Sequence, residues 1–201
     1  MPEALREAIL KRRQSLAAEL EAMEAQGQSD GWSLEVGCGH GHWMVDYAEQ
    51  HPERFCVGID LATKRIERAQ TKVRRRGLPN VHFIKAELFE FFELLPERVH
   101  LDAVFMLFPD PWPKKRHFRR RMLQAAFLTS IARRMATGAR FYFQSDHAAL
   151  FEWAEETVSE HPDWVALPAD EVEAIWPLRT VSYFEALCGT GRRLVAERCS
   201  D

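Results

Sequence analysis

The sequence predicts an α/β protein with one doubly wound, mostly parallel sheet of seven strands and helices on both faces. Five short apolar runs alternate with helix-forming segments, which is the pattern of successive βαβ units. The first run ends in a glycine loop, as in Rossmann-like folds. Two further strand-like runs, 181–187 and 193–197, are joined through Gly189 and Gly191. They predict an antiparallel hairpin at one edge of the sheet.

The parallel strands are expected at the apolar runs 33–36, 55–59, 81–84, 101–108 and 139–144. Helices are expected at 42–50, 62–76 and 88–95, then as one long helix after the proline segment 109–113 to about Met135, and at 147–161. The prolines remove backbone donors, so neither helix nor central strand continues through 109–113. Residues 3–25 are charged helix formers and 27–31 form a junction. We expect an N-terminal helical segment and linker over 1–30 and one domain over 31–201.

The length of 201 residues suits one domain with a substantial core. No stretch approaches the roughly 20 apolar residues of a membrane helix. Residues 1–24 are charged and lack the apolar segment of a signal peptide. The four cysteines form no CxxC pair, and His40 and His42 have no cysteine partners at metal-site spacing. We therefore expect a cytoplasmic protein with no membrane span and no metal; monomer and homodimer both stay open.

Charge is distributed unevenly, although the formal net charge is only −3. Residues 64–76 hold seven basic residues against one acid, and residues 114–121 hold six basic residues and no acid. Residues 141–178 hold nine acids and no Lys or Arg. Clustered cations on one face predict a polyanionic partner. For 64–76 alone, a solvated helix face explains the charges equally well.

An acidic residue follows each of the second to fifth predicted strands: Asp60, Glu87, Asp110 and Asp146. In an open α/β sheet, ligands bind outside the carboxyl ends of the strands. These acids and the glycine loop with Gly37 and Gly39 should therefore lie on one rim. Each acid alone is equally well explained as a helix N-cap, but the set indicates a ligand site.

Glu35, two positions before the first glycine, distinguishes between possible ligands. A carboxylate beneath the loop would repel the pyrophosphate of NAD or FAD, which binds to donors and a positive helix end. S-adenosylmethionine has no phosphate and carries a sulfonium and an amino group, so acids favour it. Asp60 suits the ribose hydroxyls, and Glu87 the adenine amino group. We therefore expect S-adenosylmethionine as cofactor and disfavour a nicotinamide dehydrogenase.

The segment 108–117, FPDPWPKKRH, combines groups suited to a nucleic acid. Prolines on both sides of Asp110 restrict the backbone and hold its carboxylate at a fixed site. Trp112 offers a flat surface for a base, and the following basic residues suit phosphates.

This segment resembles the hallmark of the bacterial tRNA (guanine-N7)-methyltransferase (TrmB) family. The resemblance extends through 34–41, 58–60 and 144–146 and covers roughly 32–197. It implies cofactor contacts at Glu35, Asp60, Glu87 and Asp110, and substrate contacts at Lys114 and Asp146. A further family motif near the C-terminus matches Ser182, Tyr183 and Glu185, with Ser in place of Thr. Leu187 stands where the family commonly has a basic residue, and Glu87 where it usually has Asp.

The expected reaction is methyl transfer to N7 of a guanine in tRNA, in the variable loop. Guanine N7 is a lone-pair acceptor without a proton, so alignment of the reacting atoms is the main requirement. Asp110 is expected to be catalytic, at the edge of the base. Lys114 and Arg116 are expected to bind phosphate, with Asp146 and Glu185 orienting the base. Two alternatives stay open: a methyltransferase acting on another RNA, a protein or a small molecule, and a noncatalytic RNA-binding protein.

Overall fold

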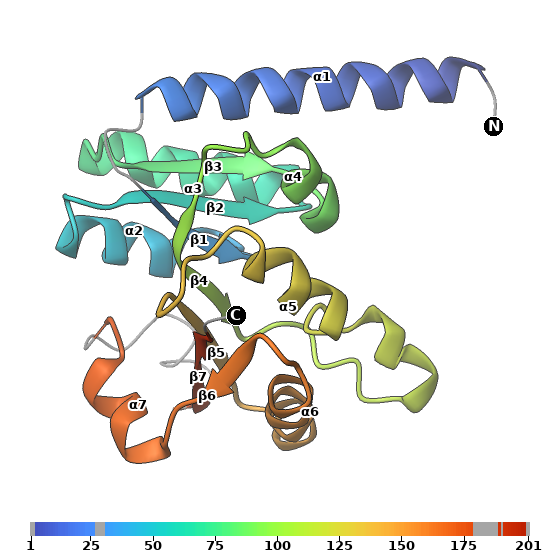
Figure 1. The fold of residues 1–201 in the computed structure, drawn as a ribbon. Helices are drawn as coiled ribbons and strands as arrows, with labels where there is room; N and C mark the ends of the chain where they lie inside the picture. The colour runs from blue at the N-terminus through green and yellow to red at the C-terminus, as the bar shows by residue number, and fades with distance from the viewer. Residues whose placement is uncertain (1–2, 27–30, 179–188, 190, 200–201) are drawn as a thin grey trace.

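The computed structural model describes residues 3–26, 31–178, 189 and 191–199. These residues form a seven-stranded sheet of order β3-β2-β1-β4-β5-β7-β6 (Figure 1). Its strands are β1 (Trp32–Val36), β2 (Phe55–Asp60), β3 (Val81–Lys85), β4 (Leu101–Leu107), β5 (Arg140–Ser145), β6 (Trp164–Ala166) and β7 (Arg192–Arg198). The first five strands are parallel, and β7 pairs antiparallel with β5 and β6. The predicted Rossmann-like sheet with antiparallel C-terminal strands is confirmed.

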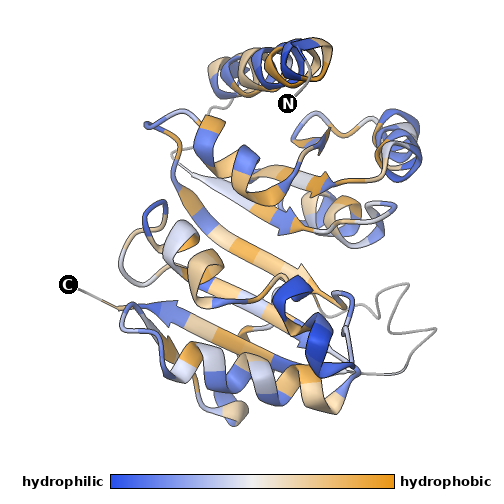
Figure 2. Cartoon of the chain, turned by 90° about the vertical axis from the view of Figure 1, so that its right-hand side faces the viewer, coloured by the Kyte–Doolittle hydropathy of each residue, from blue (hydrophilic) through white to orange (hydrophobic). Residues whose placement is uncertain are grey.

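Helices cover both faces of the sheet, as predicted for a doubly wound fold. They are α1 (Glu3–Gln26), α2 (His42–Gln50), α3 (Thr63–Arg76), α4 (Leu88–Leu94), η1 (a 3-10 helix, Lys115–Arg120), α5 (Ala125–Ala132), α6 (Ala148–Ser159) and α7 (Ala169–Ile175). One buried apolar cluster joins α1, α4, α5 and α6 to the sheet, and a second joins α2, α3 and α7 to it. Figure 2 shows the apolar strands enclosed by helices with hydrophilic outer faces. Every residue of β1 and β2 is buried, because both faces of these central strands are covered.

The N-terminal helix α1 packs on the same core through its second half. Leu16, Leu20 and Met23 are buried in the cluster that contains α4. Arg12 donates to the buried Glu90 at 2.8 Å, and Arg13 donates to Glu93 at 2.9 Å. The predicted boundary near residue 30 falls in 27–30, outside the described residues. The division into two parts therefore stays a prediction.

The predicted long helix between 113 and Met135 is wrong. The chain forms η1, an extended link and then α5, because Arg121 has ψ of 133° and Gln124 has ψ of 165°. The carbonyl of Arg121 accepts from the Gln124 side chain at 2.8 Å, and that of Leu123 accepts from the Trp153 indole at 2.8 Å. These side-chain donors replace the helical backbone donors. Leu123 is thereby fixed in the core at 1% exposure.

The C-terminal strands differ in part from the expectation. β7 forms close to the predicted 193–197, whereas the predicted strand 181–187 lies outside the described residues. The antiparallel partner at the edge is β6, which was not predicted. With three residues, of which only Trp164 is buried, β6 has no periodic sequence signal. None of the helices in the described ranges combines the length and apolarity that a membrane crossing needs.

Candidate active site

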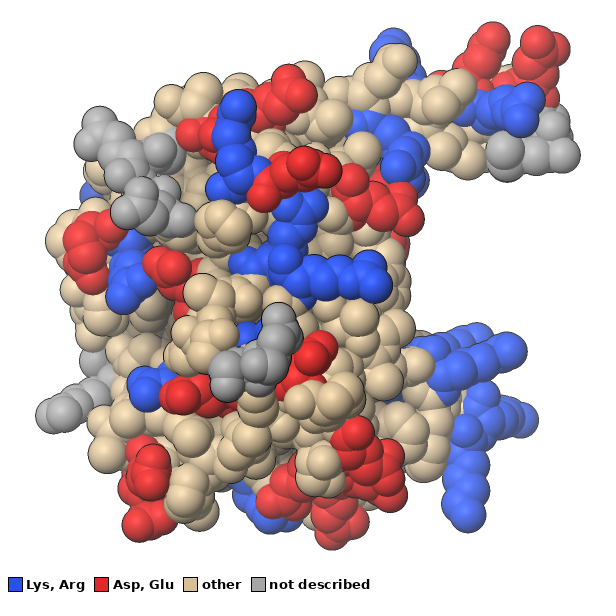
Figure 3. Space-filling view, in the orientation of Figure 1, with Lys and Arg blue, Asp and Glu red and all other residues tan. Residues whose placement is uncertain are grey.

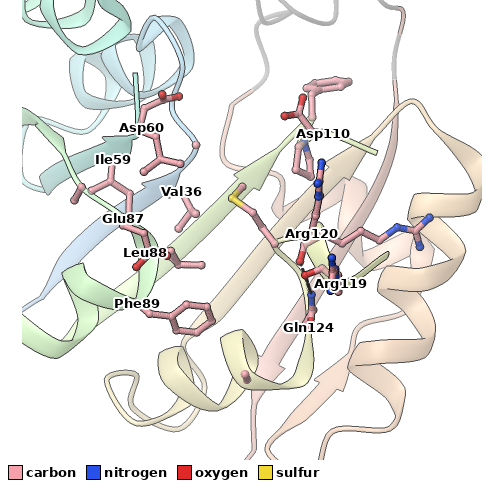
Figure 4. A pocket seen from close by; sticks show the side chains of 18 of the residues that line it. Val36, Ile59, Asp60, Glu87, Leu88, Phe89, Asp110, Arg119, Arg120 and Gln124 are labelled. Carbon is pink, nitrogen blue, oxygen red and sulfur yellow. Dashed lines mark hydrogen bonds between the residues drawn. The ribbon is translucent and has the colours of Figure 1, made fainter. Parts of the chain in front are cut away.

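A pocket of about 510 Å³ lies at the carboxyl ends of β1, β2, β3 and β4. β1 and β4 are neighbours in the sheet although two strands separate them in sequence, so the pocket lies where the strand order reverses. Ligands of doubly wound sheets bind at such a point. Gly37, Asp60, Glu87 and Asp110 all line the pocket, as their positions at strand ends predicted. Figure 4 shows Asp60 and Glu87 on one wall and Asp110 on the opposite side.

The glycine loop turns tightly over the end of β2. The N–H groups of Gly37 and Cys38 both donate to the carbonyl of Ile59, at 2.9 and 3.0 Å. Gly37 has φ of 73° and Gly39 has φ of 55°, a left-handed conformation that side chains disfavour. Gly37 lines the pocket, whereas Gly39 contacts Asp60 behind it. Gly37 therefore brings the backbone close to any ligand in the pocket.

Asp60 holds two loops together. Its carboxylate accepts from the N–H of Gly39 at 3.1 Å and from the N–H of Ala62 at 2.7 Å. Arg65, which is largely exposed, approaches the same carboxylate at 3.3 Å. A carboxylate has roughly four acceptor positions, so Asp60 can fix the loops and still accept from a ligand. Its side chain is only 6% exposed and faces the pocket.

Glu35 lies beneath the glycine loop and does not line the pocket itself. It is 4% exposed, and its Oε2 atom has no hydrogen-bond partner in the described part of the chain. Burial, and to a smaller extent the charge of Asp60, raise the pKa of Glu35 to about 8, against a lowering effect of the Met44 backbone. Without a cationic partner, this side chain is therefore largely protonated at neutral pH.

Glu87 has two roles in the described structure. It is the N-cap of α4, where its side chain accepts from the N–H of Glu90 at 2.9 Å. It also lines the pocket beside Phe89 (Figure 4). The N-cap explanation and the ligand-site explanation of this acid are thus compatible, since a carboxylate has a second oxygen.

Asp110 lies in a strained segment. Phe108 and Trp112 have φ of 48° and 44°, and they are the non-glycine residues of the described chain with positive φ. For a bulky residue this conformation costs about 1–3 kcal/mol. Pro109 and Pro111 restrict the backbone on both sides of Asp110. Strain on both sides of one exposed carboxylate is typical of a site where side-chain position matters.

Arg121 braces this segment from inside the protein. It is 3% exposed, and its Nε donates to the carbonyl of Pro111 at 3.2 Å. Its guanidinium lies 3.8 Å from the ring centre of Phe118 and 5.1 Å from that of Trp153. One terminal nitrogen has no hydrogen-bond partner among the described residues, and burial lowers the pKa of the group. Arg121 is therefore an exception among the basic residues of 114–121, because it is buried and donates to the protein's own backbone.

The cations at the start of this segment face outward. Lys114 and Arg116 are exposed and lie outside the pocket. Figure 3 shows Lys and Arg side chains standing out at the lower right, where Figure 1 has the yellow-green segment with η1. The guanidinium of Arg120 lies 4.9 Å from the ring centre of Trp112. Trp112, predicted to stack on a base, is thus already covered by a cation on one side.

Several pocket residues were missed by sequence reasoning. Arg119, Arg120 and Gln124 lie on one side of the pocket (Figure 4), and Met122 is a further lining residue. Phe89 is 42% exposed and also lines the pocket. Its signal was available: in α4 the inward positions Leu88, Phe91 and Phe92 leave Phe89 on the outer side.

The remaining predicted substrate residues lie elsewhere. Asp146 follows β5 at the same edge of the sheet, is exposed, and does not line the pocket. Gly191 lies close to the backbone of Ser145 and Asp146, so the start of β7 lies beside Asp146. Ser182, Tyr183 and Glu185 lie outside the described residues. Among the residues that are described, no group of three or more His, Cys, Asp or Glu side chains is arranged for a metal ion.

Solved structures with this fold include methyltransferases. TrmN from Thermus thermophilus superposes with a TM-score of 0.58 at 19% identity, over 92% of this chain and 48% of that chain. An rRNA methylase from Streptococcus thermophilus superposes with a TM-score of 0.55 at 13% identity, over 96% of both chains. At these identities the similarity is one of fold.

Curated relatives are more similar in sequence. A tRNA (guanine-N(7)-)-methyltransferase of Rhodospirillum rubrum is 35% identical over 150 residues, which is 70% of this chain and 58% of the relative. One of Caulobacter vibrioides is 35% identical over 148 residues, 69% of this chain and 65% of the relative. The matches thus span less than two thirds of these relatives. A family model described as "Putative methyltransferase" matches residues 30–195. The chain belongs to this methyltransferase family.

Proposed function

We propose that this chain transfers a methyl group from S-adenosylmethionine to N7 of a guanine in tRNA, in the variable loop. One observation carries the proposal: Asp60, Glu87 and Asp110 line a single pocket, and the side on which Asp110 lies also carries Arg119 and Arg120. Acids suit a cationic methyl donor, and the arginines suit a phosphodiester. The names of the curated relatives support the same reaction.

The residues present fit S-adenosylmethionine, which supplies an activated methyl group when bound. The unpartnered Oε2 of the buried Glu35 is suited to a cationic or hydrogen-donating neighbour. Asp60 retains acceptor positions for hydroxyl groups. Glu87 can accept from an amino group, with Phe89 and Leu88 providing apolar surface in the same pocket. Gly37 keeps a side chain out of the space above the loop.

Asp110 has the catalytic role in this proposal. Guanine N7 carries no proton, so Asp110 need not act as a base toward it. Its carboxylate accepts from the base and stabilises the positive charge that the purine gains. The strain at Phe108 and Trp112 and the brace from Arg121 fix that carboxylate in advance. Such preorganisation lowers the barrier because no reorganisation is needed during transfer.

The substrate-binding roles remain those expected from the sequence. Lys114 and Arg116 bind phosphates of the tRNA, for which their exposure is suited. Asp146 and the motif with Ser182, Tyr183 and Glu185 orient the guanine. We also propose a cytoplasmic location for this tRNA-modifying activity.

The test is incubation of the protein with bulk tRNA and methyl-labelled S-adenosylmethionine, followed by nucleoside analysis. We expect label in 7-methylguanosine, and none when Asp110→Ala replaces the wild type. Label in another nucleoside would show that guanine N7 is not the target. A folded wild type that labels protein or small molecules but no RNA would refute the proposal.

A further inference from the structure

The outer face of α3 carries a stripe of positive charge that starts at the pocket. Arg65, Arg68, Lys72 and Arg75 are spaced by three, four and three residues, which puts them on one side of a helix. Ten residues of helix span about 15 Å. Arg65 lines the pocket together with Arg119 and Arg120, which belong to the opposite wall. The stripe and the segment around η1 therefore flank the same opening.

Most of this stripe is not neutralised by acids. Arg65 pairs with Asp60, and the neighbouring Arg76 pairs with Asp46 and Glu49 at 2.6 and 2.9 Å. In the described parts of the chain, the structure gives no ion pair for Arg68, Lys72 or Arg75. Glu67 is the sole acid of α3. An ordinary solvated helix would alternate its charges to gain pairs three and four residues apart.

The cations converge on the back of the glycine loop. Lys72 donates to the carbonyl of His40 at 2.6 Å, and Arg68 lies 3.2 Å from the ring of the same histidine. An open groove of about 430 Å³ runs here between α3 and the loop, and Arg68, Lys72 and Arg75 line it. Burial, followed by the charges of Arg68 and Lys72, lowers the pKa of His40 despite the opposing charge of Asp60.

Burial likewise lowers the pKa of Lys72, and the charges of Arg68 and Arg76 lower it further although Asp46 opposes them. On the α2 side, His42 has a pKa lowered by burial and by Lys72. Like charges at this spacing destabilise the folded chain. Their concentration is explained if an external anion neutralises them.

We propose that Arg68, Lys72 and Arg75 form a second docking surface for the phosphate backbone of the RNA, separate from Lys114 and Arg116. The inference rests on the proposed function, since it takes tRNA as the polyanion. A linear stripe fits a chain of regularly spaced phosphates better than it fits a single small anion. With cations on both sides of the pocket, the backbone is held at two places and the guanine between them is directed to Asp110.

The test compares tRNA binding at several salt concentrations for three double variants. Arg68→Gln with Arg75→Gln removes two charges and leaves intact the hydrogen bond from Lys72 to the carbonyl of His40. Arg68→Lys with Arg75→Lys keeps the charges. Lys11→Gln with Arg133→Gln is the matched control. Both residues are exposed, Lys11 on α1 and Arg133 at the end of α5, and their replacement changes the net charge by the same amount.

For the glutamine variant we expect several-fold weaker tRNA binding and a salt slope reduced in magnitude by about 1.4–1.8, from 0.7–0.9 per lost phosphate contact. Calorimetric affinity for S-adenosylmethionine should not change. The lysine variant and the control should keep the wild-type slope. An unchanged slope in the glutamine variant, or an equal loss in the control, would overturn this inference alone. A wild type that binds no tRNA would overturn the proposed function and this inference together.

Discussion

Replacing Glu35 by Gln should stabilise the ligand-free protein increasingly, relative to the wild type, as pH rises. The substitution keeps the shape of the side chain and its ability to accept from the Met44 backbone, but removes the ionisable carboxyl. Burial raises the pKa of Glu35 to about 8 from an ordinary value of 4.5. The folded chain therefore binds this proton more tightly than the unfolded chain does.

The sign and size follow from proton linkage. Between about pH 4.5 and pH 8 the unfolded state loses the proton while the folded state keeps it, so wild-type stability falls as pH rises. Compared with a side chain that is neutral in both states, Glu35 lowers the free energy of unfolding by about 1 kcal/mol at pH 5 and by about 4 kcal/mol at pH 8. The advantage of Glu35→Gln should thus grow by about 3 kcal/mol, or roughly 6–12 °C in Tm.

The assay is thermal and urea unfolding of both proteins without ligand, at pH 5 and pH 8. The new amide N–H₂ is buried as well, and any penalty for it is the same at both pH values, so only the difference between them is diagnostic. Glu171→Gln, a substitution at an exposed position of α7, is the control and should show no such growth. A stability difference that stays constant between pH 5 and pH 8 would refute the assignment of a buried, protonated Glu35.

Three further predictions concern turnover and RNA binding. Asp110→Asn should lower the methyl-transfer rate at least about 100-fold while S-adenosylmethionine affinity, measured by calorimetry, changes far less; near-normal turnover would remove Asp110 from catalysis. Arg121→Met removes the donor to the carbonyl of Pro111 and should lower kcat in the tRNA assay with little change in KM. Arg121→Lys should have an intermediate kcat. A rise in KM alone would instead indicate that Arg121 binds phosphate. Lys114→Gln with Arg116→Gln should weaken tRNA binding and reduce the salt slope by about 1.4–1.8; an unaltered slope would argue against phosphate contacts there.

Much of the fold could be predicted because it depends on local pattern. Apolar runs alternating with helices predicted the parallel strands, and the parallel arrangement then determined which residues share an edge. That is why the amino-acid sequence alone sufficed to assign Gly37, Asp60, Glu87 and Asp110 to one pocket. The position of Glu35 before the glycine loop could be read from the sequence. Its raised pKa could not be predicted, because the shift depends on how completely the loop and α2 bury the side chain.

The remainder depends on tertiary contacts. Arg121 is the last of three consecutive arginines, and only the packing of Phe118 and Trp153 around it distinguishes a buried brace from a surface cation. The left-handed backbone at Phe108 and Trp112 contradicts local preference, so no propensity predicts it. The break between η1 and α5 depends on donors from Gln124 and from a distant helix.

The physical claim beneath these assignments is that strand-end carboxylates suit a cationic methyl donor and disfavour a phosphorylated coenzyme. The most direct measurement is calorimetric titration of the ligand-free protein with S-adenosylmethionine and, separately, with NAD. We predict saturable binding of S-adenosylmethionine, weakened by Glu35→Gln, and no binding of NAD. A folded protein that binds NAD, or that binds no S-adenosylmethionine, would contradict the claim.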